Sequence, residues 1–167
     1  MVNELTLEEV KAVLATGNFT ELTGLVENEW LECKAAPYRL QHEHQKQELA
    51  KDVSALANAS GGIILIGVRT EQDATHFGDE IVEIRPFDRT LAKPNQYQDV
   101  LTSWLYPSLW EVKIDWFESA TEAPKGICVI IIPNQPPEQK PYLLDLGSGM
   151  SLDSIARRDR TNKKADA

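Results

Sequence analysis

The hydrophobic positions of residues 48–68 change their period halfway along the segment. In the first half, apolar side chains recur at helical spacing, at Leu49, Val53, Leu56 and Ala57. The second half, residues 63–68 (IILIGV), has no polar side chain, which is typical of a strand covered on both faces. Gly61 and Gly62 separate the two halves, and at least one of them should take the left-handed conformation that ends a helix. The pattern predicts an amphipathic helix followed by the central strand of a sheet.

The chain before this segment predicts a short helix and then a strand. Thr6 and Glu9 form a capping-box pair, and the apolar positions after them predict a helix that ends at Gly17. Residues 1–24 are therefore expected to form a helical arm. Residues 27–34 (ENEWLECK) alternate in their second half, so a strand is expected that places Trp30, Glu32 and Lys34 on one face.

The rest of the chain is richer in strands. We expect a polar loop at 69–79, strands at 80–85, 110–116 and 126–132, a helix from Pro94 to the residues before Pro107, and a last pair of short strands at 142–146 and 154–158. This order predicts an α+β fold, with helices packed on a mixed, largely antiparallel sheet. One domain is expected over residues 25–162, followed by a basic tail at 163–167.

Composition limits the classes of protein to consider. The chain has 167 residues, of which 42% are hydrophobic, enough for one domain with a sizeable core. No apolar run approaches the roughly 20 residues of a membrane helix, and the polar start is not a secretory signal, so a cytoplasmic protein without a membrane partner is expected. Cys33 and Cys128 lie in expected strands, where small buried thiols are the simplest interpretation.

The formal net charge of −9 disfavours sequence-blind binding of nucleic acid, because lysine and arginine supply most of that affinity. Any nucleic-acid surface must therefore be local. Cations gather near the C-terminus, at Arg157, Arg158, Arg160, Lys163 and Lys164. They form either such a surface or a solvated basic tail.

Few patterns of known chemistry occur in the sequence. It lacks the glycine-rich phosphate loops, the CxxC and HExxH metal patterns and the GxSxG elbow. Glu27, Glu29 and Glu32 lie close together, with Lys34 two residues beyond. Carboxylates that converge can hold Mg²⁺ or Mn²⁺ for phosphodiester cleavage, whereas the simpler interpretation is a charged strand face.

Several segments together resemble the Schlafen AlbA-type domain. They are residues 27–34 (ENEWLECK), 53–68 (VSALANASGGIILIGV), 140–142 (KPY) and 155–161 (IARRDRT). The resemblance spans roughly residues 25–162, and its A-N-x-x-G-G-x-x-x-x-G block is the most specific part. It implies an α+β fold and a nucleic-acid-binding module of the kind found in bacterial regulators and ATPase-like proteins.

The resemblance also implies a route to catalysis. In animal Schlafens two such lobes form a clamp that cuts tRNA or rRNA with two Glu and one Asp around a divalent metal. The two Glu positions correspond to Glu27 and Glu32. The Asp position is occupied by Arg69-Thr70, which places a cation where a metal needs an anion. A third acid would have to come from Glu71 or Asp73.

Three hypotheses follow from the sequence and the resemblance. The first is a DNA- or RNA-binding or regulatory module, not catalytic, that forms a homodimer and binds through Lys34, Arg69, Arg157, Arg158 and Arg160. The second is an endoribonuclease for structured RNA such as tRNA, with Mg²⁺ or Mn²⁺ held by Glu27, Glu32 and a displaced acid. The third is a protein-interaction or oligomerisation module. Asn58 is expected either to cap helix carbonyls or to contact a phosphate.

Overall fold

The computed structural model describes residues 3–72 and 78–145. Three α-helices occur in this part of the chain: α1 (Leu7–Thr16), α2 (Glu43–Asn58) and α3 (Pro94–Trp104). Three single-turn helices accompany them: η1 (Phe19–Leu22), η2 (Arg89–Leu91) and η3 (Pro137–Gln139). The strands are β1 (Leu31–Lys34), β2 (Gly62–Ile66), β3 (Val68–Gln72), β4 (Asp79–Ile84), β5 (Leu105–Tyr106), β6 (Lys113–Glu118), β7 (Gly126–Ile132) and β8 (Leu143–Leu144).

The main sheet has four strands in the order β1-β2-β7-β6. β1 runs parallel to β2, while β7 is antiparallel to both β2 and β6. All five residues of β2 are buried. The sequence predictions of a central strand at this place, of a β6–β7 hairpin and of a mixed α+β fold are therefore confirmed.

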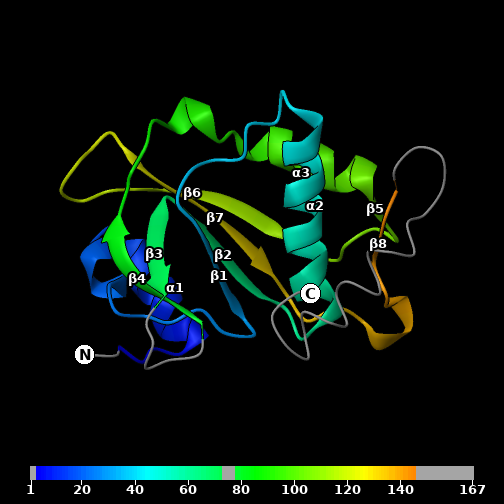
Figure 1. Cartoon of the computed structure of the whole chain (residues 1–167), viewed down its shortest axis with the longest axis horizontal. Helices are drawn as coiled ribbons and strands as arrows, with labels where there is room; N and C mark the ends of the chain where they lie inside the picture. Colours follow the sequence, from blue (N-terminus) through cyan, green and yellow to red (C-terminus); the bar gives the residue numbers. More distant parts are fainter. Residues whose placement is uncertain (1–2, 73–77, 146–167) are drawn as a thin grey trace.

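Two hydrophobic clusters cover the two faces of this sheet. Ile64 and Ile66 of β2 face the cluster that contains α2 and α3, whereas Ile63 and Leu65 face the cluster that contains α1 and η1. This alternation is the two-residue period of a strand. Helix α1 therefore lies on the side of the sheet away from α2 (Figure 1).

Helix α1 forms as the sequence predicts. The hydroxyl of Thr6 accepts from the backbone N–H of Glu9, the Glu9 carboxylate accepts from the N–H of Thr6, and Gly17 ends the helix at φ 75°. Val10 and Leu14 are buried in the cluster on this face of the sheet. The helix is thus a packed layer over β2 and β7.

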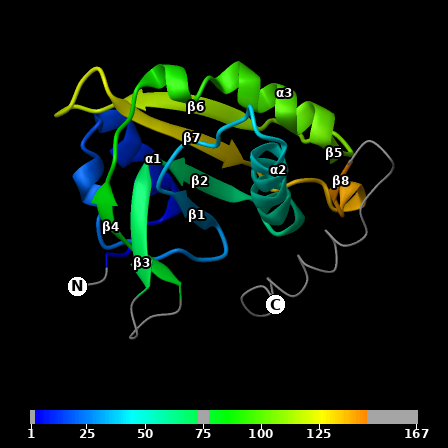
Figure 2. The same cartoon turned by 45° about the horizontal axis from the view of Figure 1, so that its top comes forward.

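The expected polar loop at 69–79 is wrong for its first part, because Val68–Gln72 forms β3. Gly67 has φ 110°, and its neighbours leave little room for a side chain: an added Cβ would lie 3.0 Å from Ile127 Cγ2 and 3.0 Å from Phe87 Cε1. The chain leaves the main sheet at this glycine. β3 then pairs with β4 in a separate hairpin beside the four-stranded sheet (Figure 2).

Other boundaries also differ from expectation. β1 begins at Leu31, so Trp30 precedes the strand and packs against the cluster on the α1 side instead of sharing a face with Glu32. β6 begins at Lys113, three residues after the expected start. β8 pairs with β5 at the end of α3, and the expected partner strand at 154–158 lies outside the described residues.

Two further sequence expectations can be compared with the structure. Cys33 and Cys128 are buried free thiols, as predicted. Of the helices in the described ranges, none is both long enough and apolar enough to span a bilayer.

Candidate functional site

Glu27 lies against the outer edge of β1. Its carboxylate Oε2 accepts a hydrogen bond of 2.9 Å from the backbone N–H of Cys33, and the Asn28 N–H donates to the Leu31 carbonyl at 3.2 Å. Both contacts satisfy backbone groups of an edge strand. Burial is the largest effect on the Glu27 carboxyl and raises its pKa to about 6; the charge of Asp79 acts in the same direction, and the hydrogen bond from Cys33 opposes it.

Lys34 points toward α2, where acids compensate its charge. Its Nζ lies 3.3 Å from Asp52 Oδ2, 3.9 Å from Glu48 Oε2 and 5.2 Å from the centroid of the Tyr38 ring. The Tyr38 hydroxyl donates to Asp52 Oδ2 at 2.6 Å. Burial raises the pKa of Asp52, and the charge of Lys34 and the Tyr38 hydrogen bond oppose that rise. Glu32 is close enough for its charge to contribute to the raised pKa of Tyr38.

The described residues do not fit a divalent-metal centre. No group of three or more acidic, histidine or cysteine side chains in residues 3–72 and 78–145 is placed to hold a metal ion. Of the two candidates for a third acid, Glu71 is paired with Arg69 and Asp73 lies outside the described residues. Glu27 and Glu32 thus lack a third ligand in the described part of the chain.

Arg69 forms ion pairs on the β3–β4 hairpin. Its Nη1 lies 2.6 Å from Glu71 Oε2, and its Nε lies 2.8 Å from Glu83 Oε1. Arg85 Nε approaches the same Glu83 oxygen at 3.1 Å. The charge of this predicted binding residue is therefore compensated. The other predicted cations, Arg157, Arg158 and Arg160, lie outside the described residues.

A basic surface that the sequence prediction missed lies at the N-terminal end of α2. Arg39 and Lys46 line a hollow of about 740 Å³ together with Leu91 of η2, and a second hollow of about 600 Å³ is lined by Arg39 and both histidines of the α2 start. We call Arg39, His42, His44 and Lys46 the basic end of α2. Figures 1 and 2 both show this end beside the chain that leads through η2 into α3.

The cations of the basic end are available to a ligand. Neither Arg39 nor Lys46 forms an ion pair with another described residue. The positive end of the α2 dipole lies at the same place, and no side chain caps the helix there. A signal was present in the sequence, because no acid occurs between Glu32 and Glu43.

The opposite end of α2 is fixed by the segment 140–142. Asn58 donates from Nδ2 to the Tyr142 carbonyl at 3.1 Å and accepts from the Tyr142 N–H at 2.6 Å, so its amide pairs with one peptide unit. The ammonium of Lys140 donates to the carbonyl of Ala59, which follows the helix. The structural role of Asn58 is therefore to join two segments that the resemblance names separately.

The two glycines after α2 are required by their neighbours. Gly61 has φ 86°, and a Cβ there would lie 2.5 Å from the Ile132 carbonyl oxygen and 2.8 Å from the Asn134 nitrogen. A Cβ on Gly62 would overlap the backbone of Trp30. Only glycine lets β2 begin between these two backbones.

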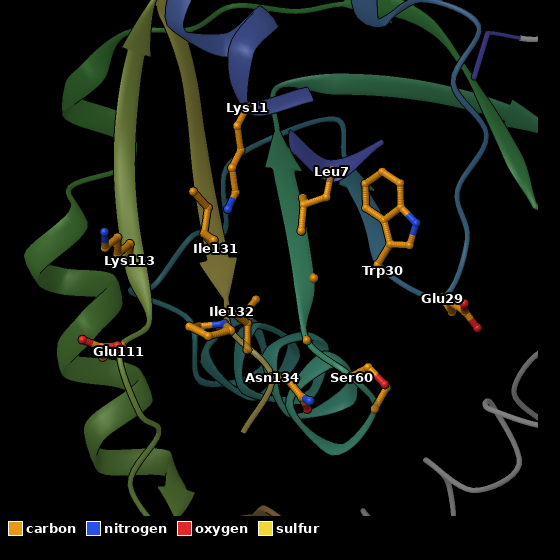
Figure 3. A pocket seen from close by; sticks show the side chains of 14 residues that line it. Leu7, Lys11, Glu29, Trp30, Ser60, Glu111, Lys113, Ile131, Ile132 and Asn134 are labelled. Atoms are coloured by element: carbon orange, nitrogen blue, oxygen red, sulfur yellow. The ribbon is translucent and has the colours of Figure 1, made fainter. Parts of the chain in front are cut away.

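A cavity of about 580 Å³ opens beside this glycine pair, and we call it the Trp30 cavity (Figure 3). Its walls come from the start of α1, the segment before β1, the end of α2 and the facing ends of β6 and β7. The lining residues are Leu7, Lys11, Glu29, Trp30, Ala59, Ser60, Gly61, Gly62, Glu111, Lys113, Ile131, Ile132, Pro133 and Asn134. The cavity thus combines an apolar floor with charged groups at its rim.

Comparison with known proteins supports the fold and gives the family. A search of curated proteins found no match. A solved structure with the same fold is the solution structure of the N-terminal domain of a protein from Nitrosomonas europaea, described as related to the ATP-dependent DNA helicase RecG. The two chains are 20% identical with a TM-score of 0.50, over 80% of this chain and 81% of the other. The model of the family described as "Schlafen, AlbA_2" matches residues 27–166. The chain therefore belongs to the Schlafen AlbA_2 family.

Proposed function

We propose that this domain is a nucleic-acid-binding module that holds phosphate groups at the basic end of α2 and does not cut its ligand. The observation that carries the proposal is that Arg39 and Lys46 line one hollow and form no ion pair with a described residue, although Asp99 lines the same hollow. Arginine and lysine bind phosphates by charge and hydrogen bonds, and the start of a helix adds a favourable dipole.

The acidity of the whole chain fits a local surface of this kind. A net charge of −9 repels nucleic acid in general, so binding depends on cations that form no ion pair and gather on one surface. Lys34 and Arg69 contribute little in this proposal, because Asp52, Glu71 and Glu83 neutralise them. Arg157, Arg158 and Arg160 remain proposed as further contacts.

The comparisons support the same class of ligand. The family is that of Schlafen AlbA-type domains, for which a nucleic-acid role is expected, and the structural neighbour is described as belonging to a protein related to a DNA helicase. That description is consistent with a module that binds DNA or RNA without acting on it chemically.

The absence of cutting is proposed from the use of the carboxylates. Glu27 accepts from the backbone of β1, and Glu71 pairs with Arg69. Cleavage by a two-Glu, one-Asp metal centre needs three converging acids, and the described residues bring no such group together. The nuclease hypothesis keeps Mg²⁺ or Mn²⁺ as its metal and Asp73 as its remaining third acid.

The decisive experiment compares two double variants of equal charge. Arg39→Gln with Lys46→Gln removes the proposed phosphate contacts, while Arg85→Gln with Lys125→Gln is the control. Binding of a fluorescent duplex is measured across a salt series. The first variant should show a weaker salt dependence, with the negative slope of log K against log salt shallower by about 2. The control should bind like the unmodified protein. Equal binding by the first variant would overturn the proposed surface.

A parallel incubation tests the proposed absence of cutting. The unmodified protein and Glu32→Ala are each incubated with tRNA and Mn²⁺. No cleavage by either is expected. Cleavage by the unmodified protein that disappears in Glu32→Ala would replace the binding module with the endoribonuclease.

A further inference from the structure

We propose that the Trp30 cavity binds one unpaired nucleotide whose base carries an amino group, such as adenine or cytosine. The inference rests on the proposed function for the class of ligand, but the site itself is separate. Arg39 precedes α2 and Gly61 follows it, and a helix of 16 residues is about 24 Å long. The two surfaces can therefore be tested independently.

The shape and the apolar groups of the cavity suit a flat base. Trp30 forms one wall, Lys11 of α1 reaches down from above, and the floor is made by Ile131 and Ile132 of β7 (Figure 3). Stacking on an aromatic side chain is a general way to hold an unpaired base, because every base has an apolar face. A volume of about 580 Å³ is within the range of small-ligand pockets.

The charged groups of the cavity narrow the class of ligand. Lys113 forms no ion pair with a described residue. Lys11 has only an exposed partner, Glu8, whose side chain is 80% exposed, and such surface pairs are weak enough to exchange. These two lysines suit a phosphate. Glu111 lines the cavity on the same side as Lys113 and can accept hydrogen bonds from an exocyclic amino group, whereas the Glu29 carboxylate lies beyond Trp30 and points away from the other lining side chains (Figure 3).

The balance of these charges favours a nucleotide over a plain anion. Two lysines and two glutamates together give no net positive charge, so a free phosphate gains little on entry. A ligand that carries both an anionic group and hydrogen-bond donors can contact the lysines and Glu111 together. Adenine and cytosine nucleotides have this combination, and uracil lacks the amino group.

The cavity is held in shape before any ligand arrives. Gly61 fits tightly against the backbone at Ile132 and Asn134, while the contacts of Asn58 with Tyr142 fix the adjoining segment. Gln135, which is 1% exposed, accepts from the Trp110 N–H at 2.7 Å and donates to the Pro133 carbonyl at 2.9 Å. Because the walls are already ordered, less conformational entropy is lost when a ligand binds.

The test is a calorimetric titration of the full chain with adenosine 5′-monophosphate, cytidine 5′-monophosphate, uridine 5′-monophosphate and inorganic phosphate. The first two should bind, uridine 5′-monophosphate should bind more weakly, and phosphate should not bind. Trp30→Ala should weaken binding about tenfold or more, as expected for a lost stacking partner. Trp110→Ala is the control, since its side chain is 53% exposed and does not line the cavity.

A second variant keeps the test decisive if Trp30→Ala does not fold. Lys113→Gln changes an exposed side chain and should weaken binding of adenosine 5′-monophosphate while leaving adenosine unchanged. Absence of binding by both amino-bearing nucleotides, free and within a single-stranded oligonucleotide, would overturn the proposal. Binding of the oligonucleotide alone, lost in the Trp30 or Lys113 variant, would support it and identify the ligand as part of a strand.

The two proposals fail in distinguishable ways. Arg39→Gln with Lys46→Gln should retain nucleotide binding, and Lys113→Gln should retain salt-dependent duplex binding. Loss of nucleotide binding in the Arg39 double variant would contradict a separate cavity site. If the Arg39 double variant loses duplex binding and the Lys113 variant retains it, the basic end is supported as the duplex site. The cavity proposal is then decided by the nucleotide titration.

Discussion

At the scale of single residues, Glu27 is fixed by one hydrogen bond to its side chain and one from its backbone. Its carboxylate accepts from the Cys33 N–H, and its own N–H donates to the Asp79 carbonyl at 2.8 Å. The hydrogen bond from Cys33 satisfies a backbone donor at the edge of β1 where no further strand pairs. A side chain that resembles a metal ligand in sequence therefore has a defined structural task.

The raised pKa of Glu27 predicts how its substitution changes stability with pH. Below pH 4.5 the carboxyl is protonated in both the folded and the unfolded chain. As the pH rises toward 6, the unfolded chain loses this proton first, so the stability contribution of Glu27 falls. The shift corresponds to about 2 kcal/mol, reduced to about 1 kcal/mol by partial exposure.

Glu27→Gln should avoid this loss, because the amide oxygen can still accept from Cys33. Its free energy of unfolding, relative to the unmodified protein, should rise by about 1 kcal/mol between pH 4 and pH 7.5. Urea unfolding at the two pH values measures this difference. Glu29→Gln, the same substitution at an exposed position, is measured alongside as the control. A Glu27→Gln difference that falls with pH would contradict the assigned environment.

The sequence identified the charged residues near β1 but not their partners. Glu32 and Lys34 follow a local alternation, which a sequence shows directly. Asp52 and Tyr38 reach Lys34 only through the packing of α2 on the sheet, and no period marks that contact. The neutralisation of Lys34 and Arg69, which reduces their value as binding residues, could therefore not be predicted.

At the level of elements, α2 joins the two proposed surfaces. Its basic end lies at one terminus and the glycine pair with the Trp30 cavity at the other. The helix was predictable from its local period, and the strand after it from a continuous apolar run. β3 was missed because its residues after Val68, RTEQ, are all polar and therefore resemble a loop.

The contact between Asn58 and Tyr142 should be a major support of this arrangement. Asn58→Ala removes both hydrogen bonds and leaves the backbone of a buried residue without them, which should cost about 2–3 kcal/mol of unfolding free energy. Denaturant unfolding measures the loss. Asn95→Ala, at an exposed position of α3, is the control.

A graded variant sharpens this test. Asn58→Asp retains an acceptor for the Tyr142 N–H but loses the donor to the Tyr142 carbonyl, so its stability should lie between those of the unmodified protein and Asn58→Ala. Asn58→Ala with unchanged stability would mean that water replaces the amide without cost.

At the level of the molecule, a chain with a net charge of −9 needs a way to bind an acidic polymer tightly. We propose that two copies act together as a homodimer, because a second basic end doubles the number of phosphate contacts. Sedimentation of the protein with a short duplex should then give two 18.7 kDa chains per duplex. A complex with one chain per duplex would contradict this proposal.

Both cysteines of the chain lie inside the protein, and this has a practical use. Burial raises the pKa of Cys33 well above its usual range and that of Cys128 to about 12, so neither forms the thiolate that reacts with maleimides at neutral pH. A cysteine placed at exposed Ser60 or Arg89 would be the sole reactive thiol. One fluorophore could thus be attached after α2, at Ser60, or on η2 beside the basic end, at Arg89, without altering the native thiols, and each surface could be followed by its own optical signal.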